Sequence, residues 1–162
     1  MTLMNFCSNC GQSMPSSDSW PRRCQECGRD HFRNPTPVVV VLLPVDSGVL
    51  AIRRAIPPAE GKLAFPGGFV DWGETWREAG AREVAEEIGL KIDPDELRLL
   101  GAESVSEGVL ILFAQANPRE SQELDVVLDT TEVSEWLILN EPREMAFSTH
   151  QDYLAQYFAL RK

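Results

Sequence analysis

Basic residues and long hydrophobic runs are both scarce in this sequence. The 162 residues include 15 Lys and Arg against 25 Asp and Glu, which gives a formal net charge of −10. This balance argues against a surface for duplex nucleic acid or anionic membranes, because both need clustered positive charge. The longest apolar run, VVVVLL at 38–43, is strand-sized and far below the roughly 18 residues of a membrane helix. We therefore expect neither a nucleic-acid nor a membrane partner.

Cysteine is absent after position 27, and the first residues lack the features of a signal peptide. The segment MTLMNFCSNC has no basic start and no long apolar stretch, so we expect no secretory leader. A cytoplasmic, reducing setting is favoured, in which paired cysteines hold metal more often than they form disulfides. With 43% hydrophobic and 25% charged residues, the composition is typical of a globular protein with a sizeable core.

The cysteines form two C-x-x-C pairs separated by 13 residues, and each pair is followed by glycine. This spacing predicts a tetrahedral zinc site, with two disulfides as the alternative. Four thiolates leave no open coordination position, so the zinc would be structural and would supply folding energy to a short segment. His31 is an alternative ligand, although a surface histidine is the simpler interpretation. The expected ligands are Cys7, Cys10, Cys24 and Cys27.

A stiff joint separates this segment from the rest of the chain. The sequence NPTP at 34–37 has two prolines in four residues, which disfavour helix. We place a zinc ribbon at 1–34 and a second domain at 35–162. Apolar patterning in the second domain predicts strands at 38–43, 48–54, 97–106, 109–116 and 132–139, and helices at 75–89 and 148–162, the latter capped by Ser148 or Thr149. Residues 117–131 are mostly polar and are expected to form a loop. This order of elements predicts an α+β fold, an α/β/α sandwich around a mixed sheet.

The stretch GGFVDWGETWREAGAREVAEEIGL, residues 67–90, gathers five glutamates in a protein that is already acidic. Thr75 and Glu78 form a T-x-x-E capping box that starts a helix, and Gly89 is placed to end it. Helical spacing directs Ala81, Val84, Ala85 and Ile88 towards the core. The same spacing puts the carboxylates of Glu83, Glu86 and Glu87 together on another side, with Arg82 four residues from both Glu78 and Glu86.

Such an acidic face is either simply solvated or binds a cation. Like charges at i and i+4 mildly destabilise a helix, so Glu83 and Glu87 need a reason to be there. The glycine-rich turn FPGGFVDWGE lies directly upstream and could bring backbone against the same face. Carboxylates with a backbone carbonyl make a site of hard oxygen ligands suited to Mg²⁺ or Mn²⁺. Such ions clamp phosphate oxygens and activate water.

These residues resemble a known family motif. Gly68, Glu74 and the run REVAEEIGL at 82–90 match the Nudix box, G-x5-E-x7-R-E-U-x-E-E-x-G-U with U aliphatic, at every fixed position. The resemblance implies a mixed sheet between helices over about 35–162, and hydrolysis of a nucleoside diphosphate linked to another group. It also implies Mg²⁺ or Mn²⁺ bound by Glu83, Glu86, Glu87 and the Gly67 carbonyl. Arg82 would orient one of these glutamates, and Glu74 would support the site or add a ligand.

The general base differs between members of this family. One glutamate of the box can serve, and so can an acidic residue on a later loop. We assign the base to Glu83 and retain three alternatives, which are Glu107, Glu132 and Glu135.

A zinc ribbon followed by a Nudix domain resembles two groups, NADH pyrophosphatases and smaller FAD or ADP-ribose pyrophosphatases. The NADH group carries an S-Q-P-W-x-F-P-type signature after the box, and the corresponding stretch here, ESVSEGVLILFAQ, lacks it. We therefore expect a small nucleotide substrate, FAD or ADP-ribose, with release of AMP. Hydrolysis of NADH or NAD, a sensing domain without turnover, and a binding adaptor are the alternatives, and a homodimer is compatible with the sequence. Aromatic residues that could stack on adenine, or simply pack, are Phe65, Phe69, Trp72 and Phe147.

Overall fold

The computed structural model describes residues 5–14, 19–106, 108–129 and 131–161. The chain forms two compact units, Met1–Pro35 and Thr36–Lys162. In the smaller unit, strand β1 (Arg22–Arg23) pairs antiparallel with β2 (Asp30–His31). Its buried apolar cluster, among the described residues, consists only of Cys7, Met14 and Cys24. So small a core leaves most of this unit's stability to other interactions.

The larger unit is built on a mixed sheet whose strand order is β5-β4-β3-β8-β7. The central strand β3 runs parallel to β8, and the remaining pairs are antiparallel. Two further strands join this path, since β6 pairs with β3 and β9 pairs with β4. The bounds are β3 Thr36–Val45, β4 Gly48–Arg54, β5 Leu63–Ala64, β6 Gly67–Phe69, β7 Arg98–Val105, β8 Val109–Gln115 and β9 Val133–Leu139.

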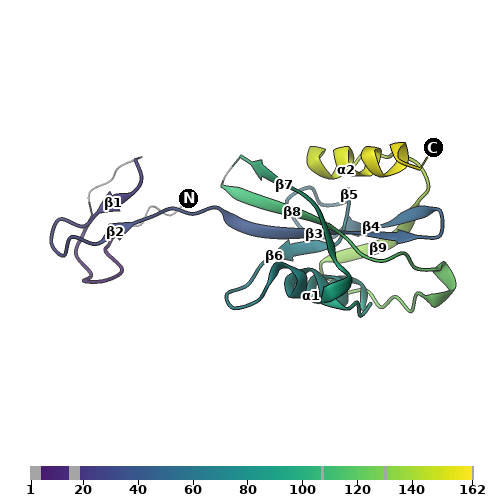
Figure 1. Cartoon of the computed structure of the whole chain (residues 1–162), viewed down its shortest axis with the longest axis horizontal. Helices are drawn as coiled ribbons and strands as arrows, with labels where there is room; N and C mark the ends of the chain where they lie inside the picture. Colours follow the sequence, from purple (N-terminus) through teal and green to yellow (C-terminus); the bar gives the residue numbers. More distant parts are fainter. Residues whose placement is uncertain (1–4, 15–18, 107, 130, 162) are drawn as a thin grey trace. The chain divides into compact units, whose positions relative to one another are not determined.

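Helices α1 (Trp76–Ile88) and α2 (Ser148–Ala159) cover opposite faces of this sheet (Figure 1). Alternate residues of β3 therefore enter two different cores. Val39 and Val41 pack in the cluster that contains α1, whereas Val40 and Leu42 pack with α2. This arrangement explains the continuous apolar run at 38–43, because a strand covered on both faces has no polar side. It also confirms the α+β sandwich expected from the sequence.

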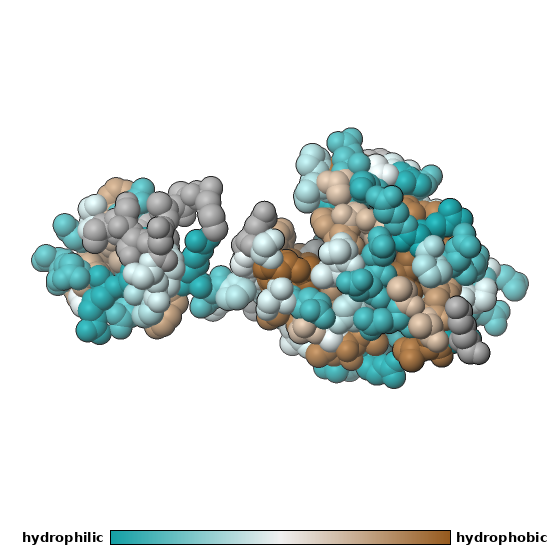
Figure 2. Space-filling view, turned by 90° about the horizontal axis from the view of Figure 1, so that it is seen from above, coloured by the Kyte–Doolittle hydropathy of each residue, from teal (hydrophilic) through white to brown (hydrophobic). Residues whose placement is uncertain are grey.

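The outer surface of this unit is mixed in character. Figure 2 views it from the α2 side and shows hydrophilic residues over much of that face, with apolar groups between them. Two short 3-10 helices, η1 (Pro94–Glu96) and η2 (Ser121–Glu123), interrupt the connections between strands. Among the described residues, no helix is long and apolar enough to cross a membrane.

The expected strands and both expected helices are present, with differences at their ends. The two shortest strands of the larger unit, β5 and β6, are not predicted, because two or three residues carry no periodicity. The expected loop at 117–131 contains the short η2. The proposed cap of the last helix is wrong, because the N-cap is Phe147, whose backbone is still extended at φ −130° and ψ 140°. Ser148 and Thr149 both lie inside the first turn of α2.

Candidate active site

The carboxylates of the glycine-rich stretch are oriented by a helix with defined ends. The Thr75 side chain accepts a hydrogen bond from the backbone N–H of Glu78, and the Glu78 carboxylate accepts one from the N–H of Thr75. At the other end Gly89 adopts the left-handed conformation, with φ 73°, and its N–H donates to the Ala85 carbonyl. The capping box expected from the sequence is therefore formed. It sets where α1 begins, and so which side chains face the preceding turn.

Strand β6 places the backbone of two glycines, which carry no side chain, against these carboxylates. The N–H of Gly67 donates to Oε2 of Glu87 at 3.0 Å. A Cβ at Gly67 would lie 2.2 Å from the Val39 carbonyl oxygen, and one at Gly68 would lie 2.4 Å from Oε1 of Glu83. Glycine is required at position 67, where a methyl group would overlap the backbone of β3, whereas at position 68 a methyl group would displace the Glu83 carboxylate.

If Glu83 has the role that the Nudix resemblance implies, we expect Gly68→Ala to lower turnover by about tenfold to a hundredfold, the cost of displacing such a group by about 1 Å. The clash is with the end of the Glu83 side chain rather than with backbone, so the fold should survive while that carboxylate moves. Steady-state kinetics and thermal unfolding would measure the two effects separately. In a Glu83→Gln background the same change should add little, since coupled sites are not additive. Full additivity would show that Gly68 acts by another route.

Arg82 is the centre of the polar network on α1. Its guanidinium donates to carboxylate oxygens of three glutamates, Glu74 at 2.8 Å, Glu83 at 2.8 Å and Glu86 at 2.9 Å, and to the Phe69 carbonyl at 2.9 Å. The hydrogen bond from Arg82 holds the pKa of Glu74 below its usual value. The positively charged side chain of Arg82 thus holds three of the predicted site residues together and links them to the end of β6.

The predicted carboxylates differ sharply in exposure. Glu87 is only 6% exposed, the Glu83 side chain is 13% exposed, and that of Glu86 is 58% exposed. Burial raises the pKa of Glu83, although Arg82 opposes the shift. Burial also raises the pKa of Glu87 to about 8, with the Gly67 hydrogen bond opposing it and the charges of Glu83 and Glu132 adding to it. Negative charge at this position is therefore under-compensated, which favours a bound cation.

The carboxylate oxygens of Glu83, Glu86 and Glu87 do not all lie within 4.8 Å of one another in the described structure. Within the described ranges, the cysteines are the only group of three or more metal-binding side chains whose ligand atoms all lie within 4.8 Å of one another. Arg82 instead engages Glu83 and Glu86 through the same nitrogen, Nη1. Arg82 occupies only Oε1 of Glu83 and Oε2 of Glu86, which leaves the second oxygen of each carboxylate for a cation.

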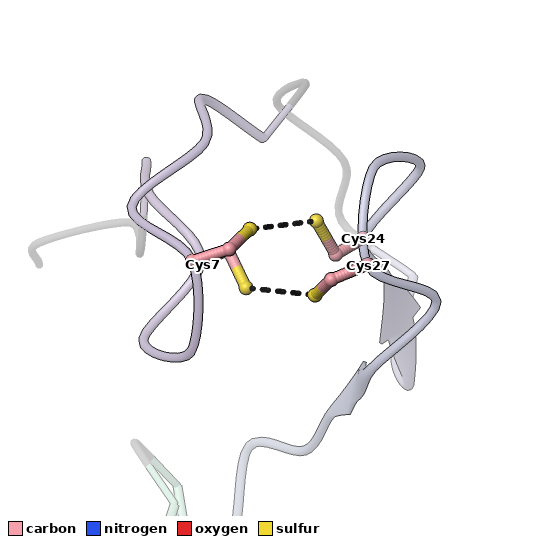
Figure 3. A group of neighbouring side chains, drawn as sticks. Cys7, Cys24 and Cys27 are labelled. Carbon is pink, nitrogen blue, oxygen red and sulfur yellow. Dashed lines mark hydrogen bonds between the residues drawn. The ribbon is translucent and has the colours of Figure 1, made fainter.

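The four cysteines of the smaller unit converge as the spacing predicted. The Sγ atoms of Cys7 and Cys27 are 3.6 Å apart, and those of Cys10 and Cys24 are 3.7 Å apart (Figure 3). Ligands about 2.3 Å from a tetrahedral zinc lie about 3.8 Å from one another, so the separations match zinc coordination, whereas a disulfide requires about 2.05 Å. All four cysteines are free thiols. The cluster suggests a structural zinc site.

His31 does not lie on the surface, so that expectation is wrong. It is 5% exposed, and its Nε2 lies 3.3 Å from Sγ of Cys7. The backbone N–H of Asn9 lies 3.4 Å from the same sulfur. Both contacts fit groups that support the charge of a metal-bound thiolate rather than groups that bind the metal themselves.

The residues proposed as alternative general bases or as adenine-stacking aromatics do not form one group. Glu107 lies outside the described residues. Glu135 projects from β9 and pairs with Arg53 at 2.6 Å, whereas Glu132 stands near enough to raise the pKa of both Glu83 and Glu87. Of the four aromatic candidates, Phe65 is buried, Phe69 and Trp72 are largely exposed, and Phe147 lies 5.5 Å beneath the guanidinium of Arg54.

Two residues near the site were missed by sequence reasoning. Arg54 ends β4, donates to the Pro58 carbonyl at 2.8 Å, and opposes the upward pKa shift of Glu87. His150, on α2, accepts a hydrogen bond from the backbone N–H of Phe65. Neither residue belongs to a recognisable local pattern. Both contacts depend on strands and helices that are distant in sequence.

Comparison with known proteins places the larger unit in a family. The family model of the NUDIX domain matches residues 33–157. The NAD-capped RNA hydrolases NudC of Salmonella heidelberg (strain SL476) and Salmonella typhi are each 34% identical over 88 residues, which cover 54% of this chain and 34% of each relative. The chain thus spans about a third of the length of the curated relatives it matches.

Solved structures show the same fold. A NUDIX hydrolase from Nitrosomonas europaea superposes with a TM-score of 0.80 at 28% identity, over 98% of this chain and 92% of that one. The MutT protein of Methanosarcina mazei Go1 superposes with a TM-score of 0.64 at 22% identity, over 82% of this chain and 99% of that one. The second likeness concerns the fold alone.

Proposed function

The chain belongs to the NUDIX family, and we propose that it is a divalent-metal-dependent pyrophosphohydrolase acting on a nucleoside diphosphate linked to another group. The observation that carries this proposal is the network on α1. Arg82 holds Glu74, Glu83 and Glu86 together, beside a buried Glu87 that accepts the N–H of Gly67. A purely solvated acidic face would not bury a carboxylate or raise its pKa to about 8.

The donor set fits Mg²⁺ or Mn²⁺. These ions prefer carboxylate and carbonyl oxygens, and burial, which raises the pKa of both Glu83 and Glu87, makes their charges unfavourable unless a cation compensates them. We assign Glu83, Glu86, Glu87 and the Gly67 carbonyl as ligands. When bound, the ion would clamp phosphate oxygens and lower the pKa of the attacking water. Arg82 would hold Glu83 and Glu86 in place, and Glu74 would hold Arg82.

We now favour Glu132 over Glu83 as the general base. Glu83 is engaged by Arg82 and is needed as a ligand, so its oxygens are less available to the attacking water. Glu132 is exposed, follows the loop that precedes β9, and acts electrostatically on both buried glutamates. Glu135 is held by Arg53 and is less suitable.

Replacing Glu132 by glutamine is expected to lower kcat by about a hundredfold, the lower end of what general-base catalysis contributes. The affinity for Mn²⁺ should change little, because the carboxylates of α1 remain. Glu135→Gln is the matched control and should retain near-normal turnover. Equal losses in both variants would rule out Glu132 as the base, and so would a loss in Glu132→Gln that comes entirely from weaker Mn²⁺ binding.

For the substrate, we propose an adenosine diphosphate conjugate cleaved to AMP and the phosphorylated other half, which would be FMN from FAD or ribose 5-phosphate from ADP-ribose. The absence of the tryptophan-proline signature from 103–115 argues against NADH. The NAD-capped RNA hydrolases among the relatives keep NADH and NAD as the second candidate class. A sensing domain without turnover is disfavoured by the complete set of glutamates.

A substrate panel tests this proposal directly. FAD, ADP-ribose, NADH, NAD⁺, NAD-capped RNA, dinucleoside polyphosphates and nucleoside triphosphates would be incubated with Mg²⁺ or Mn²⁺, and products identified. We expect AMP release from FAD or ADP-ribose with the highest kcat/KM. Preference for triphosphates by about tenfold, or about 1.4 kcal/mol, would reject the specificity while leaving hydrolysis intact. Binding without any product would support the sensor instead.

A further inference from the structure

His150 contacts the chain segment that leads into the active site. It is only 4% exposed, and its Nδ1 accepts a hydrogen bond from the backbone N–H of Phe65 at 3.2 Å. Phe65 lies two residues before Gly67, whose backbone touches Glu87. Helices α1 and α2 lie on opposite faces of the sheet (Figure 1), so this histidine reaches the turn from the side away from the carboxylates.

The backbone N–H of Phe65 needs a side-chain acceptor because of its position between two strands. It lies between β5 and β6, and in the described structure its N–H makes no backbone hydrogen bond. An imidazole fits, because aromatic rings hold it in place. It stacks on Phe65 at 5.5 Å between centroids and meets Phe113 edge-on at 5.5 Å. The N–H of Phe65 points at Nδ1, which fixes the tautomer with Nδ1 unprotonated, and burial lowers the pKa of His150 to about 3, which favours the neutral ring.

The residues after Phe65 are fixed in turn. The carbonyl of Pro66 accepts the N–H of Val41 at 2.8 Å, and the N–H of Gly67 donates to Glu87 at 3.0 Å. A Cβ at Gly67 would lie 2.2 Å from the Val39 carbonyl oxygen, so the backbone there is pressed against β3. Only two peptide bonds thus separate the amide that His150 holds from the amide that contacts Glu87.

We propose that His150 is a positioning residue of the active site, whose Nδ1 fixes the Phe65–Gly67 turn and thereby the backbone of Gly67 opposite Glu87. It touches neither substrate nor metal. Its effect on metal binding rests on the proposed function, whereas its effect on the turn does not. A histidine that merely fills the core would contribute by packing and would leave Gly67 unaffected.

Two substitutions of His150 distinguish the loss of its hydrogen-bond acceptor, Nδ1, from the loss of its aromatic ring. His150→Phe keeps an aromatic ring in the stack and removes the acceptor. His150→Asn removes the ring, but its Oδ1 is attached to Cγ as Nδ1 is, so it can still accept from Phe65. Amide hydrogen exchange at Phe65 and Gly67, and the Mn²⁺ dissociation constant of the full chain, would be measured for both variants.

In His150→Phe we expect exchange at both amides to accelerate by about tenfold or more, and Mn²⁺ to bind about tenfold more weakly, with exchange in the centre of α2 unchanged. His150→Asn should restore both readouts to within about threefold of the native protein. Native exchange at Gly67 in His150→Phe would overturn the proposal. Equal impairment in both variants would overturn it as well, because packing would then explain the effect.

A measurement on the native protein covers the case in which His150→Phe does not fold. Nitrogen NMR of the imidazole should show Nδ1 unprotonated and coupled through a hydrogen bond to the Phe65 amide, with the proton on Nε2. A proton on Nδ1 would overturn the proposal. If every substrate in the panel is refused while the exchange effects appear, the proposed function fails and the positioning role stands.

Discussion

Replacing Glu87 by glutamine is expected to lower kcat by at least about a hundredfold while leaving the fold intact. Glutamine has the same size, and its side-chain oxygen can still accept the N–H of Gly67, so only the charge is lost. Glu87 is 6% exposed and burial raises its pKa to about 8, so its carboxylate is unfavourable there unless a bound cation compensates the charge. Glu83→Gln should cause a loss of the same order.

The same substitutions are expected to lower activity without lowering stability. In the presence of a chelator, Glu87→Gln should melt at the same temperature as the native protein or slightly higher, because glutamine is neutral at every pH, whereas the buried Glu87 carboxyl must either take up a proton or carry an unfavourable charge. Kinetics with Mg²⁺ and thermal unfolding in chelator would test both effects. Glu141→Gln, which alters a surface glutamate paired with Arg143, is the control and should behave as the native protein. Native turnover in Glu83→Gln or Glu87→Gln would reject the site assignment.

Removal of zinc is expected to unfold the smaller unit and to spare the larger one. The buried apolar cluster of the smaller unit contains Met14 and two of the cysteines, so little remains to hold it together. Structural zinc sites contribute about 10–16 kcal/mol of binding free energy, which is also folding free energy. Cys24→Ser should therefore lose the metal and expose the amides of 5–14 and 19–33 to rapid exchange.

Metal analysis of the native protein should give close to one zinc per chain, and Cys24→Ser close to none. Hydrolysis should persist in Cys24→Ser, because four thiolates leave the zinc no open position for catalysis. Persistent protection of the smaller unit without zinc would contradict a structural role for the metal. Disulfides between the cysteines of the purified protein would contradict the site itself.

Much of the fold could be predicted because its signals are local. The run at 38–43 and the apolar segments at 109–116 and 132–139 correspond to β3, β8 and β9. The very short β5 and β6 carry no periodicity, and they exist only because β3 and β4 offer them partners. The last helix shows the same limit, since Ser148 looked like a cap while the extended backbone of Phe147 sets the actual start.

The sequence by itself determined the glutamate face of α1 and the cysteine cluster. Spacings of three and four residues bring side chains together on any helix, and two C-x-x-C pairs converge once their turns form. Only the tertiary structure decided that Glu87 is buried while Glu86 is exposed, that Gly68 leaves room for Glu83, and that Glu132 approaches them. It also brought His150 to Phe65 across 85 residues of chain. These features depend on which faces pack together, and packing of distant segments leaves no period or spacing in the sequence.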